Sequence, residues 1–192
     1  PDYSMCFHNA MVHYENGNTE NHLFAKLENR EYQVEETVEN WIVPTASILL
    51  RSSILSSSYY KRVGESKKLV VGDNPLIRCC GMSGKIYGFK DVMGVYRKQP
   101  GGWTENLNAG FLLKLIEQEL EYTRIFGKRF AKYSKAGIAR HSRGAISLLN
   151  KKEYRKCLII WWYALRYAPV QSIIANFKYA IHLLQNGTAH NK

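Results

Sequence analysis

The sequence predicts a mixed α/β domain over residues 1–104, followed by an all-helical C-terminal extension over residues 105–192. Three observations predict this division. Before residue 104, short apolar runs alternate with turns rich in Gly, Asn and Ser, which is typical of strands joined by loops. After residue 105, apolar residues recur at the spacing of an α-helix. The charge changes at the same place: residues 1–104 carry 12 Lys or Arg and 11 Asp or Glu, whereas residues 105–192 carry 15 and 5.

The strands of the first part are predicted from their apolar runs. Residues 3–14 predict a buried strand that ends at an Asn-Gly-Asn turn. Residues 41–51 predict a second strand with Pro44 at its start, because proline cannot donate a hydrogen bond to a sheet and is confined to strand beginnings and edges. Two short strands are predicted at 85–89 and 92–97.

Helices and loops fill the rest of the first part. Residues 20–40 are polar and Glu-rich and predict a loop with a short helix. Residues 52–58 predict a serine-rich turn. Asp73 followed by Pro75 is typical of a helix start, so a helix is predicted over residues 74–82.

Four helices are predicted in the C-terminal extension. The first begins near Leu107 and stops at Gly127, and the others cover residues 136–150, 153–167 and 172–185. Proline or glycine after the last apolar position marks the end of most of them.

Composition excludes several classes of protein. The 45% hydrophobic content is too high for a disordered or collagen-like chain. No apolar run reaches the roughly 18 residues that a membrane span needs. The four cysteines form no CxxC pair, so we expect free thiols and a cytoplasmic protein. His8 and His13 have no third ligand nearby in the sequence, and no metal site is predicted from them.

Four segments, in this order, resemble bacterial family-2 glycosyltransferases of the GT-A fold. Residues 1–9 resemble the strand that follows the metal-binding motif of that family, and residues 43–51 resemble its acceptor-side strand. Residues 72–76, Gly-Asp-Asn-Pro-Leu, resemble its acidic base motif at a helix start. Residues 84–103 resemble the sheet edge and the loop that closes over the donor.

The resemblance implies a partial GT-A-like mixed sheet with flanking helices. It also implies inverting transfer of a sugar from a nucleotide-sugar donor to a saccharide or lipid-linked acceptor, as in polysaccharide biosynthesis. Family members hold Mg or Mn through a DxD motif, which Asp2, Asp73 and Asp91 cannot form because they are scattered along the chain. We therefore expect the metal ligands and the donor-binding half to lie upstream of Pro1, and this fragment by itself to be inactive.

Asp73 is the predicted catalytic residue. Inverting transfer needs one carboxylate that takes the proton from the attacking acceptor hydroxyl. A helix start holds a side chain rigidly, and its dipole favours a negative charge. The local sequence alone favours a helix cap, the surrounding resemblance favours the catalytic role, and the two roles are compatible.

The resemblance also predicts seven residues that contact the donor or the acceptor. They are Thr45, Ser47, Arg97, Gln99, Gly101, Gly102 and Trp103. Structural alternatives stay open for these positions: ordinary strand residues for Thr45 and Ser47, a surface ion pair for Arg97, and domain packing for Trp103.

The basic helical extension allows two interpretations. The apolar runs at 158–163 and 173–177 lie among Lys and Arg residues, so they form either an in-plane membrane face at the inner side of the membrane or ordinary helix packing. The alternative function for the whole chain is an inactive fragment or a helical scaffold that uses this extension for protein, membrane-surface or nucleic-acid contacts. No zinc-finger or aromatic RNA-binding pattern is present, so nucleic acid is not the expected partner.

Overall fold

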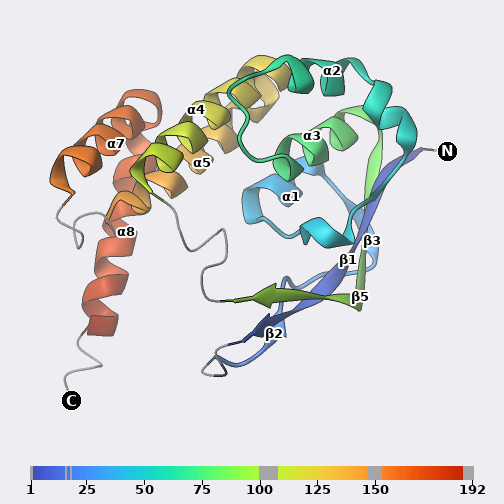
Figure 1. Ribbon diagram of the computed structural model, residues 1–192, viewed down its shortest axis with the longest axis horizontal. Helices are drawn as coiled ribbons and strands as arrows, with labels where there is room; N and C mark the ends of the chain where they lie inside the picture. The colour runs from blue at the N-terminus through green and yellow to red at the C-terminus, as the bar shows by residue number, and fades with distance from the viewer. Residues whose placement is uncertain (1, 16, 18, 100–107, 147–152, 188–192) are drawn as a thin grey trace. The chain divides into compact units, whose positions relative to one another are not determined.

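The computed structural model describes residues 2–15, 17, 19–99, 108–146 and 153–187, with the backbone alone for 182–187. The chain divides into two compact units, residues 1–106 and 107–192. The first is a five-stranded mixed sheet with helices, and the second is a helical region of about four helices (Figure 1). The predicted fold class is confirmed at this level of description.

The sheet of the first unit is built around one long parallel pair. Its strands are β1 (Tyr3–Tyr14), β2 (His22–Leu23), β3 (Arg30–Tyr32), β4 (Leu49–Leu50) and β5 (Lys85–Lys98). The strand order is β2-β1-β5-β3, and β4 also pairs with β1. The β1–β5 pair is parallel, whereas the other pairs are antiparallel. The strand predicted at residues 3–14 is confirmed.

Strand β5 is irregular in its middle. His8 and Asn9 are adjacent on β1, but their partners on β5 are Phe89 and Val92, so the register shifts between the two pairs. Figure 1 shows β5 changing direction along its length. Such irregularities bend a strand and disturb its ladder. The two short strands predicted at this place are therefore two halves of one continuous strand.

Three strands meet at a polar contact on the exposed side of the sheet. The Tyr3 hydroxyl of β1 donates to Oε1 of Glu31 on β3 at 2.7 Å. The Lys85 ammonium of β5 donates to the same oxygen at 2.9 Å. The Lys85 ammonium, with the Tyr3 hydroxyl as the second cause, holds the pKa of Glu31 below its usual range. This contact fixes the relative positions of β1, β3 and β5 at one end of the sheet.

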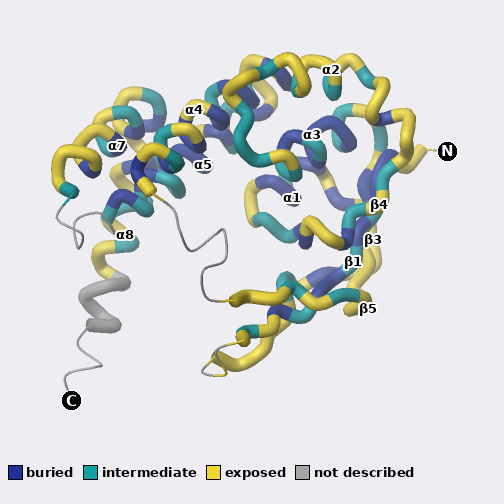
Figure 2. The backbone as a smooth tube through the Cα atoms, viewed as in Figure 1, coloured by how far each residue is buried: buried dark blue, intermediate teal, exposed yellow. Residues whose placement is uncertain are grey.

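Helices α1 (Val34–Asn40) and α3 (Asp73–Ser83) pack together, and α3 packs on β1 and β5. Figure 2 shows buried positions along both helices and along the strands beside them. The largest fully buried apolar side chains of this core are Met5, Phe7, Ile77, Ile86 and Val43. Helix α2 (Ser58–Glu65) buries none of its residues fully and lies at the surface.

The strand predicted over residues 41–51 was wrong for most of its length. The chain forms a short 3-10 helix, η1 (Thr45–Ser47), and only β4 pairs with the sheet. The reason is local: the Pro44 carbonyl accepts hydrogen bonds from the backbone N–H of Ser47 at 2.9 Å and from its hydroxyl at 2.7 Å. These two bonds close a turn at the point where an extended chain was expected. The serine-rich stretch that follows forms a second 3-10 helix, η2 (Ser52–Ser56).

The second unit contains α4 (Ala109–Phe126), α5 (Ala131–Arg143), α7 (Tyr154–Tyr167) and α8 (Pro169–Gly187). Gly127 ends α4 with a positive φ of 88°, as predicted. Helix α5 begins earlier than expected, and positions 147–150 of that predicted helix lie outside the described residues. Helix α8 begins at Pro169, because proline fits the first turn of a helix, where no N–H is needed. No helix in the described ranges is both long and apolar enough to cross a membrane.

The contact between α1 and α3 gives a first testable prediction. A methyl group added at Gly81 of α3 would overlap the Val34 side chain of α1, whereas the space around Gly64 of α2 is open. Overpacking a core contact costs about 1–3 kcal/mol. We expect Gly81→Ala to lower the free energy of unfolding by this amount in urea titrations. Gly64→Ala is the matched control and should stabilise the protein slightly, because alanine favours helix more than glycine does. Equal effects of the two changes would contradict the α1–α3 contact.

The buried thiols of α3 give a second prediction. Burial raises the pKa of Cys79 to about 11 and that of Cys80 to about 12. Because the thiolate is the reactive form, both should resist alkylation by iodoacetamide at pH 8 in the folded protein. Mass spectrometry of peptides should find both labelled once urea unfolds the chain, whereas the partly exposed Cys6 serves as an internal reference. Fast labelling of Cys79 or Cys80 in the folded protein would show that α3 does not bury its thiols.

Candidate functional site

Two of the residues predicted from the sequence, Thr45 and Asp73, lie in direct contact. The Thr45 hydroxyl donates a hydrogen bond to Oδ2 of Asp73 at 2.7 Å, across 28 residues of sequence. The other carboxylate oxygen, Oδ1, accepts the backbone N–H of Asn74 at 2.7 Å. Each oxygen of the Asp73 carboxylate therefore has one fixed donor, and the group is held in a defined orientation.

Asp73 reaches this position as the first residue of α3. The residue that caps the helix is Gly72, not Asp73 as the local sequence suggested. By accepting the Asn74 N–H, the Asp73 side chain still satisfies one of the donors that every helix start leaves free. The buried residues Ile77 and Cys80 further along α3 anchor the helix in the core. The hydrogen bond to the helix start and a chemical role for Asp73 are thus compatible in this geometry.

Thr45 is positioned by the end of α1. Helix α1 ends at Trp41, whose left-handed backbone (φ 52°, ψ 54°) turns the chain. Val43 and Pro44 are then buried, and the turn from Pro44 to Ser47 leaves Thr45 exposed at the start of η1. Its hydroxyl points to the start of α3, as the hydrogen bond to Asp73 shows.

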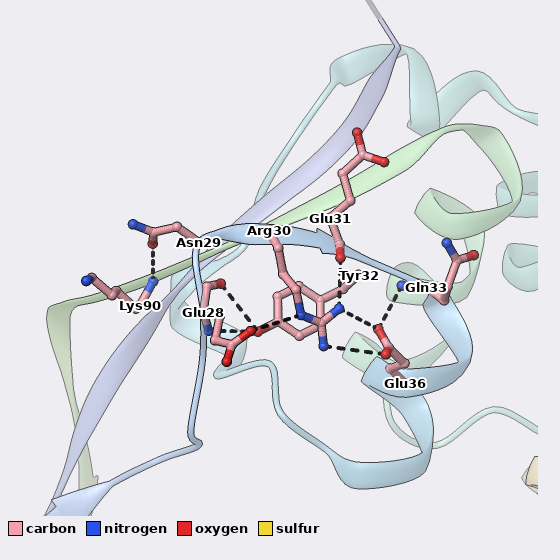
Figure 3. Close-up of polar contacts among 8 residues, drawn as sticks. All are labelled: Glu28, Asn29, Arg30, Glu31, Tyr32, Gln33, Glu36 and Lys90. Carbon is pink, nitrogen blue, oxygen red and sulfur yellow. Dashed lines mark hydrogen bonds and ion pairs between the residues drawn. The ribbon is translucent and has the colours of Figure 1, made fainter.

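Helix α1 itself is fixed at its start by Arg30 and Glu36 (Figure 3). The Arg30 guanidinium donates to both carboxylate oxygens of Glu36, at 3.0 and 3.4 Å, and lies 3.8 Å from the centre of the Tyr32 ring. The hydrogen bond to Glu36 is the main reason that the pKa of Arg30 is raised. Planar two-point pairing of this kind orients both partners.

Glu36 also accepts the backbone N–H of Gln33 at 3.1 Å, and the two side chains form a capping box. On the other side of β3, Asn29 Oδ1 accepts the Lys90 N–H of β5 at 2.8 Å, as Figure 3 shows. This cluster was not found from the sequence. The spacing of Gln33 and Glu36, three residues apart, indicates only the capping box and not the contacts of Arg30 or Asn29.

Among the other predicted contact residues, those that the structure describes form no hydrogen bond or ion pair with Asp73. Ser47 is buried, and its hydroxyl donates to the Pro44 carbonyl. Arg97 is exposed near the end of β5 and forms an ion pair of 3.1 Å with Glu15. Gln99 is exposed directly after β5. Gly101, Gly102 and Trp103 lie outside the described residues.

A cavity of about 540 Å³ lies beside the sheet, lined by residues 3–6 of β1 and by residues 49–53. Neither Thr45 nor Asp73 lines it. The described residues contain no group of three or more His, Cys, Asp or Glu side chains that could hold a metal ion. The divalent cation implied by the resemblance therefore has no ligand set in the described part of the chain.

Comparison of the chain with protein-family models, with curated proteins and with solved structures gave no match. The functional assignment consequently rests on the residues and on the geometry described above.

The Thr45–Asp73 contact gives a third prediction. Thr45→Val keeps the shape of the side chain but removes the donor to a charged acceptor, whereas Thr45→Ser keeps the hydroxyl. A hydrogen bond to a charged group contributes about 1.5–3 kcal/mol. We expect urea titrations to show that loss for Thr45→Val and a smaller change for Thr45→Ser. If valine and serine have the same effect, the hydroxyl does not stabilise the fold.

Proposed function

We propose that this chain is the acceptor-side part of an inverting, nucleotide-sugar-dependent glycosyltransferase with a GT-A-like sheet, and that Asp73 is its general base. The observation that carries the proposal is the Thr45–Asp73 hydrogen bond. The resemblance put these two residues in separate segments, one beside the acceptor and one as the base. Their contact supports the proposal, because an acceptor bound beside Thr45 would lie near the carboxylate of Asp73.

The proposed reaction has one displacement step. The acceptor hydroxyl oxygen forms a bond to the anomeric carbon of the donor sugar, and its proton passes to the Asp73 carboxylate. The bond between that carbon and the diphosphate oxygen breaks, and the nucleoside diphosphate leaves with the electron pair. Attack from the side opposite the leaving group inverts the configuration at the anomeric carbon. Asp73 must be ionised and oriented for this step, since the base has to lie within hydrogen-bond reach of the proton it takes.

Thr45 acts in this proposal as a positioning residue. Its hydroxyl occupies Oδ2 of Asp73, and Asn74 N–H occupies Oδ1, so rotation of the carboxylate is restricted. Each carboxylate oxygen has a further lone pair that can accept the acceptor hydroxyl. Preorganisation by neighbouring hydrogen bonds is the usual way in which a catalytic group is held within reach of its substrate.

The surroundings of the site support the same proposal. The base lies at the start of a helix that packs on a parallel strand pair, and β5 leads directly from the sheet to residues 99–103, which are the proposed donor-side loop. Arg97 lies near the end of β5 and Gln99 directly after it, where they would contact the donor together with that loop. The proposal places the Mg or Mn ligands outside this chain, and no part of the step above is assigned to the cation. A saccharide or lipid-linked acceptor at the cytoplasmic face of a membrane is the substrate class proposed.

The fourth prediction tests the base. In the complete enzyme, Asp73→Asn should lower the turnover of sugar transfer by about 10²–10⁴-fold, because an amide cannot take the proton. Transfer is measured with radiolabelled UDP-, GDP- and dTDP-linked sugars, and donor binding by calorimetry should be almost unchanged. Asp91→Asn is the matched control, since Asp91 is an exposed residue of β5.

In the same assay, Thr45→Val tests whether the Thr45 hydroxyl orients the Asp73 carboxylate, because valine keeps the shape of the side chain but removes the hydrogen bond. It should reduce turnover without changing donor affinity, and Thr45→Ser should restore most of the rate. Full turnover in Asp73→Asn, or an equal loss in Asp91→Asn, would rule out Asp73 as the base.

A further inference from the structure

Helices α7 and α8 bury one face and expose apolar side chains on the other. In α7 the buried residues are Cys157, Ile160 and Ala164. Leu158 and Trp162, one turn apart, are 63% and 55% exposed. One face of α7 therefore packs within the helical unit, and large apolar groups of the same helix face solvent.

Helix α8 repeats this arrangement. Ser172 is buried, whereas large apolar residues recur at helical spacing on the exposed face of the helix. The most exposed of them is Phe177, at 67%. The other exposed apolar residues of α8 are Val170, Ile173, Ile174 and Ile181. Figure 2 shows exposed positions along both helices. Between the two helices lies a groove of about 210 Å³, lined by Trp161, Ala164, Leu165, Ser172, Ile173 and Asn176.

The charged side chains within α7 and α8 are all positive. The sequence contains no Asp or Glu after Glu153, but it contains Arg155, Lys156, Arg166 and Lys178 in α7 and α8. Arg166 lies beside the apolar face, with its guanidinium 5.3 Å from the centre of the Trp162 ring. A long cationic side chain next to an exposed tryptophan is typical of a helix that lies at a lipid–water boundary.

We propose that the exposed apolar face of α7 and α8 docks in the plane of an anionic phospholipid bilayer. Apolar side chains enter the boundary of the acyl chains, and the arginines and lysines meet the lipid phosphates. The charge favours this occupant over a second copy of the chain, because Lys156 alone among these cations pairs with an acid in the described structure, Glu153 at 3.0 Å, and two such faces would bring the others together. The exposed apolar side chains favour lipid over nucleic acid, because binding to nucleic acid would leave them in water. The proposal does not depend on the transferase activity.

The fifth prediction is tested by flotation of the full 192-residue chain with vesicles. We expect binding to vesicles that contain phosphatidylglycerol and at least about tenfold weaker binding to pure phosphatidylcholine. Brominated lipids should quench tryptophan fluorescence, and Trp162→Leu should reduce that quenching. Ile173→Ser with Phe177→Ser should weaken binding at least about tenfold through lost apolar burial. Arg166→Gln should weaken binding about fivefold.

The control uses exposed apolar residues elsewhere. Met93→Ser with Val95→Ser removes two exposed side chains of β5 and should leave vesicle binding unchanged. Circular dichroism checks that each variant is folded. Absence of vesicle binding, or equal binding to the two lipids, would overturn the proposal. Light scattering provides a further test. If the chain is a dimer, and Ile173→Ser with Phe177→Ser makes it a monomer but leaves vesicle binding intact, the exposed face is a dimer interface and the proposal is overturned.

Discussion

The parallel pairing of β1 and β5 is the constraint on which the first unit depends. Parallel strands cannot be joined by a tight turn, so the chain between them must make a crossover. Here that crossover runs from residue 15 to residue 84 and contains β2, β3, β4 and helices α1–α3. Both Thr45 and Asp73 belong to it. Their meeting is therefore a consequence of how the crossover folds back on the strand pair, and not of any local motif.

Within the crossover, a series of contacts determines where Thr45 and Asp73 lie. Arg30 and Glu36 fix the start of α1, and the left-handed turn at Trp41 sets the direction of the chain toward Thr45. Gly81 lets α3 approach Val34 of α1 closely, which sets the axis of α3. A hydrogen bond of 2.7 Å between the first residue of α3 and the chain after α1 requires both helices to be in place. The distance between Thr45 and Asp73 therefore depends on how closely α1 packs against α3.

Two features of the fold that depend on local sequence patterns were predicted correctly. The strand over residues 3–14 follows from its apolar run, and the end of α4 at Gly127 follows from a glycine that can adopt positive φ. The 3-10 turn at Pro44 was missed, because the bonds from Ser47 compete with an extended chain that the apolar pattern equally allows. The Arg30–Glu36 pair joins a strand to a helix, and a linear pattern does not show which charges meet. Helical spacing marked α7 and α8 as apolar, but it did not show which side of each helix would be covered.

The two proposals differ in how they should respond to salt, and the distribution of charge explains why. In the first unit three acids at the sheet and at α1 form ion pairs: Glu31 with Lys85, Glu36 with Arg30, and Glu15 with Arg97. Residues 105–192 carry a formal net charge of +10 out of the +11 of the chain, and the cations of α7 and α8 are among them. Exposed cations attract an anionic surface through solvent, where the screening length is about 8 Å at physiological ionic strength. Attraction of α7 and α8 to an anionic surface must therefore weaken as salt rises. The proton transfer proposed for Asp73 occurs within hydrogen-bond distance and should not.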